Sequence, residues 1–171
     1  MIVCYFDGGC SANGNVFCAS IVLKIQYPTM DHLYVPSQAE QLLYCYSGKM
    51  KGEEGYEETS SNMAEYMGFI NVAAFLIKNN LCGNEEIKIY GDSQLVVKQM
   101  RGEWKIKDGV YFRHAMMAKA YVEQLENVKI QWIPREFNTM ADELSSKFFK
   151  NKRKETMEEY SKRLLNELLD T

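Results

Sequence analysis

Residues 1–9 read MIVCYFDGG, an almost unbroken apolar run that ends in an acid and two glycines. Its continuous apolar character predicts a strand covered on both faces, and therefore a central strand, with a short buried helix as the alternative. Asp7 closes this run, either as the cap of a turn or as a functional acid. Gly8 and Gly9 allow close approach of the backbone to another strand or to a ligand.

The composition is that of one globular domain. The chain has 171 residues, of which 46% are hydrophobic and 25% are charged, enough to bury a sizeable core. Its apolar runs are too short to cross a bilayer and no basic segment precedes the first strand, so we expect neither export nor a membrane span. The five cysteines form no CxxC pair, which favours free thiols in the cytoplasm over disulfides or zinc. With a net charge of −3, nucleic-acid binding would depend on a local patch.

The hydrophobic patterns predict an α/β fold with a five-stranded mixed sheet whose first three strands are antiparallel. The Asn13-Gly14 pair favours a hairpin between the first two strands. After the third strand, helices and strands alternate, which predicts crossover connections. The predicted strands are residues 2–6, 16–25, 41–46, 87–90 and 128–132. The predicted helices are residues 62–80 with Ser61 or Asn62 as cap, 94–100, 110–125, and a last helix through Phe149 capped by Asn138 or Thr139.

Four carboxylates lie where an apolar strand ends or a buried helix begins: Asp7, Glu65, Asp92 and Asp142. Each has a local alternative, such as Asp92 as a helix N-cap, because acids are favoured in caps and first turns. In the predicted order, however, residues 2–6 and 87–90 are parallel neighbours, so Asp7 and Asp92 come together and flanking helices supply the other two. Converging carboxylates repel one another unless cations neutralise them. Oxygen ligands without His or Cys predict Mg²⁺ or Mn²⁺.

Four separated motifs carry a resemblance to a known family: FDGG (6–9), SSNMAEY (60–66), YGDSQLVVKQMRGEWKIK (90–107) and WIPREFNTMADEL (132–144). With these motifs in this order and spacing, the chain resembles type 1 ribonuclease H over about residues 1–149, which implies the ribonuclease H-like fold. The segment after Trp104 leads directly into the next helix, as in the compact, archaeal-like branch of that family.

The resemblance implies an endonuclease that hydrolyses the RNA strand of RNA–DNA hybrids and leaves 5′-phosphate and 3′-hydroxyl ends. Asp7, Glu65, Asp92 and Asp142 match the family's catalytic acids, which together hold two Mg²⁺ or Mn²⁺ ions. Two such cations about 4 Å apart activate a water, orient the scissile phosphate and stabilise the leaving 3′ oxygen.

The resemblance also implies contacts with the hybrid. Backbone after the first strand would lie along the RNA 2′-hydroxyls, and two side chains would lie near the minor groove, where the 2′-hydroxyl identifies RNA. A loop after the second helix would face the DNA strand, although lysines in such a place are also often simply solvated. The backbone residues are Gly8, Gly9 and Cys10, and the two minor-groove side chains are Asn62 and Gln94. The loop residues are Trp104, Lys105 and Lys107.

Two departures from the family pattern affect the expected site. Ser61 replaces an asparagine of the family's Thr-Asn-Asn, so one amide contact becomes a hydroxyl. The mobile histidine of bacterial members is absent, and neither histidine of this chain replaces it by position. Arg135 stands where the compact branch carries Arg or His, which implies a catalytic role. The alternative is a surface arginine paired with Glu136 or Glu143.

Two other functions fit the same residues. One is a nuclease of the same fold that prefers DNA, and the other is a catalytically silent nucleic-acid binder. The intact acids argue against the silent binder, because an inactive scaffold would gain stability by losing buried like charges.

The expected domain organisation is a catalytic domain over residues 1–150 and a helical tail over residues 151–171. The run KFFKNKRK (147–154) carries five basic residues and no acid. The tail is expected to bury a helical stripe against the body or a partner, formed by Met157, Tyr160, Leu164 and Leu168.

Overall fold

The structure is a computed structural model that describes residues 1–11, 15–25, 39–50, 60–146, 162–163 and 166. The predicted tail stripe, the basic run 147–154 and residues 26–38 lie outside the described residues, so the expected domain boundary stays a prediction. Within the described part of the chain, no helix combines the length and the apolar character that a membrane span requires.

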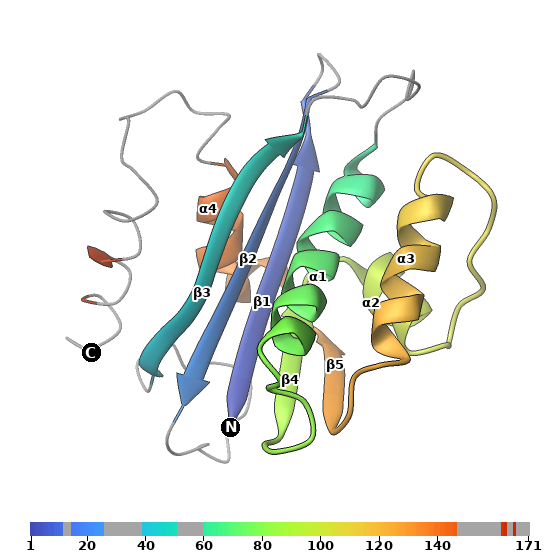
Figure 1. Cartoon of the computed structure of the whole chain (residues 1–171). Coiled ribbons are helices and arrows are strands. Elements are labelled where there is room, and N and C mark those ends of the chain that lie inside the picture. Colours follow the sequence, from blue (N-terminus) through green and yellow to red (C-terminus); the bar gives the residue numbers. More distant parts are fainter. Residues whose placement is uncertain (12–14, 26–38, 51–59, 147–161, 164–165, 167–171) are drawn as a thin grey trace.

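In the part of the chain that the structure describes, five strands and four α-helices follow the predicted order (Figure 1). The strands are β1 Ile2–Cys10, β2 Val16–Ile25, β3 Ala39–Met50, β4 Ile87–Gly91 and β5 Val128–Trp132. The helices are α1 Ser61–Lys78, α2 Gln94–Met100, α3 Phe112–Val122 and α4 Thr139–Ser146, with a 3-10 turn η2 at Arg135–Phe137.

The sheet is mixed, with the strand order β3-β2-β1-β4-β5. β2 pairs antiparallel with β1 and β3, whereas β4 pairs parallel with β1 and β5. The predicted topology is therefore confirmed, including the central place of β1.

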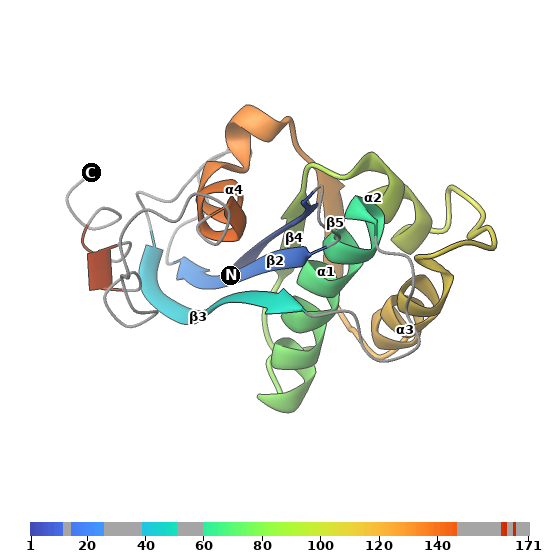
Figure 2. The ribbon, with the colours of Figure 1, turned by 90° about the horizontal axis from the view of Figure 1, so that it is seen from above.

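Helices cover both faces of the sheet, with α1 and α3 on one side and α4 on the other (Figure 2). Alternate residues of β1 enter two separate cores: Ile2, Cys4 and Phe6 pack with α1, and Val3 and Tyr5 pack with α4. Two covered faces explain why this strand is an apolar run rather than an alternating one.

β1 is longer than predicted, and the reason is its two different neighbours. Parallel pairing with β4 ends at Phe6, but antiparallel pairing with β2 continues to Cys10. Asp7 is thus the first residue of β1 that has no partner on β4. It lies within a strand that is still paired with β2 on its other side, and not in a turn.

Two helix caps differ from the predicted ones. Ser60, not Ser61 or Asn62, caps α1, because its hydroxyl accepts a hydrogen bond from the third helical amide at 3.2 Å. Ser93, not Asp92, caps α2 in the same way at 3.5 Å. Each serine accepts a hydrogen bond from an amide of the first helical turn that has no partner within the helix. Because Ser93 does this for α2, the carboxylate of Asp92 is not needed as the cap and is available for another role.

Glycines allow α1 to lie unusually close to β1. A Cβ on Gly8 would lie 2.2 Å from the Ala64 carbonyl carbon and 2.3 Å from the Glu65 nitrogen, and one on Gly68 would lie 2.7 Å from the Asp7 carbonyl oxygen. The expected close approach at Gly8 is therefore made to a helix backbone. This close packing brings Glu65 beside Asp7, where β4 ends and β1 continues.

Candidate metal and active site

Three carboxylates converge where β1 separates from β4. The last parallel pair is Phe6 with Gly91, so Asp7 and Asp92 follow on adjacent strands, and α1 supplies Glu65. One oxygen from each of the three acids lies within 4.8 Å of the others. The predicted meeting of Asp7 and Asp92, with Glu65 from a packed helix, is confirmed.

Asp142 approaches from the opposite side of the sheet, in the first turn of α4. It lies outside the group of three, and its Oδ1 accepts a hydrogen bond from the Arg135 guanidinium. Its charge still raises the pKa of both Asp7 and Glu65, so the four acids share one electrostatic site. Arg135 thus forms an ion pair with one of the four acids, and its catalytic role stays a prediction.

Burial and mutual repulsion shift the titration of two acids. Burial, with smaller contributions from the Asp92 and Asp142 charges, raises the pKa of Asp7 to about 6. The pKa of Glu65 is raised well above its usual range, again mainly by burial and then by the Asp7 and Asp92 charges. The buried Oε2 of Glu65 has no hydrogen-bond partner among the described residues.

These properties fit a hard divalent cation. A cation would neutralise the repulsion and provide a partner for the orphaned Glu65 oxygen, and a set of carboxylate oxygens is what Mg²⁺ and Mn²⁺ prefer. Asp7, Glu65 and Asp92 are the residues that could hold it, with Asp142 available once Arg135 moves.

Two neutral side chains that the motif analysis did not single out for the site hold the acids in place. The Asn138 amide nitrogen donates to the Phe6 carbonyl at 2.8 Å and to Asp92 Oδ1 at 2.9 Å. The Ser145 hydroxyl contacts Asp7 Oδ2. Asn138 was expected only as a helix cap, and a serine inside a short helix gave no signal.

The residues implied for RNA contact lie around the acids. Gly8 and Gly9 continue β1 directly after Asp7, and Asn62 and Gln94 are exposed in the first turns of α1 and α2. Their positions beside the site are compatible with the implied contacts, which remain predictions.

The residues implied for DNA contact lie in the loop beyond the other end of α2. Trp104 is 44% exposed, Lys105 and Lys107 are exposed, and Lys98 Nζ lies over the Trp104 ring, 4.6 Å from its centroid. Lys98 adds a positive charge to this surface that sequence motifs did not single out.

A buried glutamine fixes that loop to the body. Gln99 accepts a hydrogen bond from the Tyr66 hydroxyl of α1, and its amide nitrogen donates to the Lys105 carbonyl at 2.8 Å. The backbone position of the loop is thus tied to the helix that carries Glu65.

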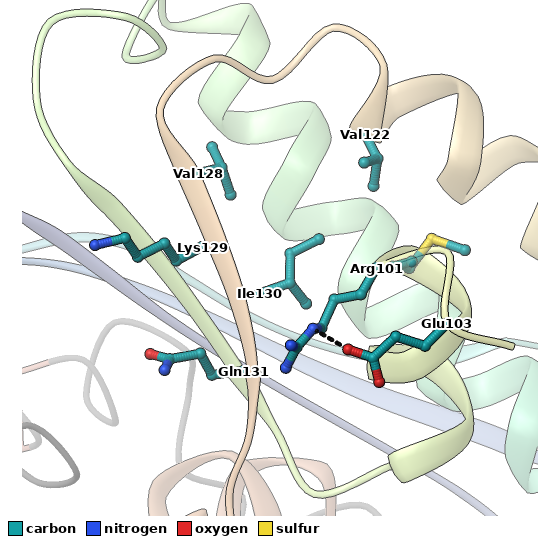
Figure 3. A pocket seen from close by; sticks show the side chains of 8 residues that line it. Arg101, Glu103, Val122, Val128, Lys129, Ile130 and Gln131 are labelled. Carbon is teal, nitrogen blue, oxygen red and sulfur yellow. Dashed lines mark ion pairs between the residues drawn. The ribbon is translucent and has the colours of Figure 1, made fainter.

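A separate open groove of about 500 Å³ lies between the end of α2, β5 and the end of α3 (Figure 3). Val122, Val128 and Ile130 contribute apolar side chains, and Arg101 and Glu103 form an ion pair at 2.7 Å beside them. None of the four acids lines it, so it is not part of the metal site.

The class that this sheet order and acid placement define is the ribonuclease H-like fold. A family model described as reverse transcriptase-like matches residues 41–148. The chain belongs to this family, and type 1 ribonucleases H are among the relatives and solved structures that it resembles.

Among curated proteins, the chain is 32% identical over 96 residues to the bifunctional protein Rv2228c of Mycobacterium tuberculosis. It is 31% identical, also over 96 residues, to ribonuclease HI of Halobacterium salinarum. These matches cover 56% of this chain but only 26% and 47% of the relatives. The chain thus spans about a quarter to a half of the curated proteins it matches.

Solved structures share the fold over most of the chain. The N-terminal ribonuclease H domain of Rv2228c is 28% identical with a TM-score of 0.65, covering 85% of this chain and 91% of that one. LC11-RNase H1 in complex with an RNA/DNA hybrid is 23% identical with a TM-score of 0.64, covering 86% and 95%. The predicted resemblance to type 1 ribonuclease H is confirmed.

Proposed function

We propose that this protein is an endonuclease that hydrolyses the RNA strand of RNA–DNA hybrids and leaves 5′-phosphate and 3′-hydroxyl ends. The observation that carries the proposal is the convergence of Asp7, Glu65 and Asp92 oxygens within 4.8 Å, with Asp142 beside them. The family relationship supports the reaction, and LC11-RNase H1 was solved with such a hybrid bound.

The proposed cofactor is a pair of Mg²⁺ or Mn²⁺ ions held by the four acids. When bound, these ions supply the positive charge that activates a water and stabilises the leaving oxygen. The chain's own part is to set the ligands. Asn138 orients Asp92 by its 2.9 Å hydrogen bond, and the exposed Arg135 offers a cation to the scissile or departing phosphate.

Selectivity for the hybrid is proposed to rest on two surfaces on either side of α2. The backbone at Gly8, with Asn62 and Gln94, would contact 2′-hydroxyls that DNA lacks. The loop from Trp104 to Lys107 would hold the deoxy strand, whose geometry differs from that of A-form RNA. Because the net charge is −3, we expect modest affinity that falls steeply with salt.

The direct test is cleavage of matched, end-labelled RNA–DNA, RNA–RNA and DNA–DNA duplexes with Mg²⁺ or Mn²⁺. We expect cuts in the RNA of the hybrid alone, with phosphatase-sensitive 5′ ends on the new fragments. Equal cutting of hybrid and DNA duplex would make the protein a DNA-acting nuclease of this fold. Binding of the hybrid without any cutting would make it a silent binder.

A further inference from the structure

Ser145 of α4 touches the metal-site acid that lies on the central strand. Its hydroxyl contacts Asp7 Oδ2, and both residues are almost fully buried, at 4% and 5% exposed. The same hydroxyl lies 3.1 Å from the Asp142 carbonyl oxygen in its own helix. Ser145 thus joins the acid of β1 to the helix that carries the acid of α4.

The hydroxyl has one proton for these two acceptors. A hydrogen bond to a charged carboxylate is about twice as strong as one to a neutral acceptor, so an ionised Asp7 takes the proton in preference to the Asp142 carbonyl. That carbonyl keeps its backbone partner within the helix. The bond to Asp7 then limits rotation of the carboxylate, as does the hydrogen bond that the carboxylate makes with the Gly8 backbone, so its oxygens are held beside Glu65 and Asp92.

We propose that Ser145 is a positioning residue that fixes the Asp7 carboxylate for the divalent cation. This inference rests on the proposed metal site and adds to it a hydroxyl that lies just beyond the last of the four sequence motifs, residues 132–144. When a residue that orients a metal ligand in this way is mutated, metal affinity or activity typically falls by roughly 10- to 100-fold.

The hydroxyl is not needed to attach α4 to the sheet. Ala141 and Leu144 are fully buried in the core between α4 and the sheet, and the Ser47 hydroxyl of β3 donates to the Leu144 carbonyl at 2.9 Å. Removal of the Ser145 oxygen therefore leaves the helix docked by contacts that do not involve Asp7.

The test is Mn²⁺ and Mg²⁺ binding to the whole chain by titration calorimetry, without nucleic acid, for Ser145→Ala and Ser145→Thr. We expect Ser145→Ala to weaken binding by about 10-fold, and Ser145→Thr, which keeps a hydroxyl, to recover most of that loss. Two control variants should keep parental affinity. Ser146→Ala removes a neighbouring hydroxyl that donates to the Glu143 carbonyl at 3.1 Å, and Ser47→Ala removes a buried one at the same helix.

Three results would overturn the assignment: parental affinity in Ser145→Ala, equal losses in the alanine and threonine variants, or an equal loss in Ser146→Ala. Failure of the proposed function would look different. In that case the parent would bind Mn²⁺ through Asp7, with binding lost in Asp7→Asn, yet cut no hybrid, and the role of Ser145 would stand. A parent that cuts the hybrid while Ser145→Ala binds metal normally would refute Ser145 alone.

Discussion

The guanidinium of Arg135 holds the carboxylate of Asp142, seven residues further along the chain, in an ion pair at the edge of the acid cluster. The pair raises the pKa of Arg135 through the Asp142 hydrogen bond and charge. The Arg135 side chain is 74% exposed and that of Asp142 only 32%. The arginine is thus the partner that can leave, which would free Asp142 for a cation and bring Arg135 to a phosphate.

Arg135→Ala is expected to slow turnover without weakening metal binding. Loss of a cation near the reacting phosphate should cost up to about 10²-fold in rate, while Asp142 loses a competitor for the metal. Single-turnover rates and calorimetric Mn²⁺ affinity measure the two effects separately. The control is Arg101→Ala, which removes an arginine from another surface ion pair, with Glu103. Parental rates in Arg135→Ala would return Arg135 to a surface role.

Asp7→Asn and Asp92→Asn are each expected to abolish cleavage while keeping the fold intact. Each acid is a proposed metal ligand, and removal of its charge relieves repulsion in the metal-free protein. The thermal midpoint without metal should therefore hold or rise as turnover disappears. Asp108→Asn changes an exposed acid and should alter neither. Turnover retained in both variants would remove the two-metal assignment.

The metal-free protein is expected to lose stability as the pH rises from about 4 to above 6. Asp7 has a pKa of about 6 in the folded state against 3.8 for the ordinary side chain, so the folded state binds its proton more tightly. That stabilisation is fully present below 3.8 and is lost as the pH rises through 6. A pKa difference of about 2 corresponds to about 3 kcal/mol. The raised pKa of Glu65 acts in the same direction.

Urea unfolding in a chelator, from pH 4 to pH 7.5, measures this effect when parent and Asp7→Asn are compared. The advantage of the variant should grow with pH, because it has no proton to lose at this position. A constant difference in the free energy of unfolding would show that Asp7 titrates normally.

Gly8→Ala is expected to destabilise the protein and to disrupt the acid cluster together. The added Cβ would lie 2.2 Å from the Ala64 carbonyl carbon, which is backbone and cannot rotate away. The N-terminal end of α1 must then shift, with Glu65 on it. The free energy of unfolding, measured by denaturant titration, should fall by about 1–3 kcal/mol, and the Mn²⁺ affinity should fall as well. An unchanged metal affinity would mean that α1 can move without carrying Glu65 away.

Gln99→Leu is expected to raise the KM for the hybrid more than it lowers kcat. It would leave the Tyr66 hydroxyl and the Lys105 carbonyl without their partner, at a cost of about 1–3 kcal/mol, and release the Trp104 loop. Gln124→Leu, at an exposed site that bonds the Ala120 carbonyl at 2.9 Å, is the matched control. A fall in kcat alone would place Gln99 with the acids rather than with substrate binding.

The sequence predicted the features that follow from periodicity and strand order. A doubly covered strand is apolar throughout, and parallel neighbours end at the same edge, so the meeting of Asp7 and Asp92 was accessible without coordinates. The site roles of Asn138 and Ser145 were not, because their partners are distant in sequence. Asn138 bonds Phe6 and Asp92, 132 and 46 residues away, and Ser145 contacts Asp7, 138 residues away. An asparagine before a helix and a serine within one have common local roles that hide such distant contacts.

The residue at which a strand ends and the residue that caps a helix could also not be predicted from sequence patterns. β1 passes Asp7 because only one of its two neighbours stops there, and that difference exists only in the assembled sheet. At the start of α1, Ser60, Ser61 and Asn62 are consecutive polar residues, and each is a suitable N-cap. Sequence alone does not say which one caps the helix, and in the structure it is Ser60.

The contact between Asp7 and Ser145 also bears on when the protein can act during its synthesis. The two residues are separated by 138 positions, and Asp142 belongs to the same late helix. A nascent chain that has emerged only through β5 carries three acids but neither the fourth nor the hydroxyl that holds the first. The complete set of four acids, with Asp7 held by Ser145, is therefore expected to assemble only after α4 has left the ribosome and docked on the sheet.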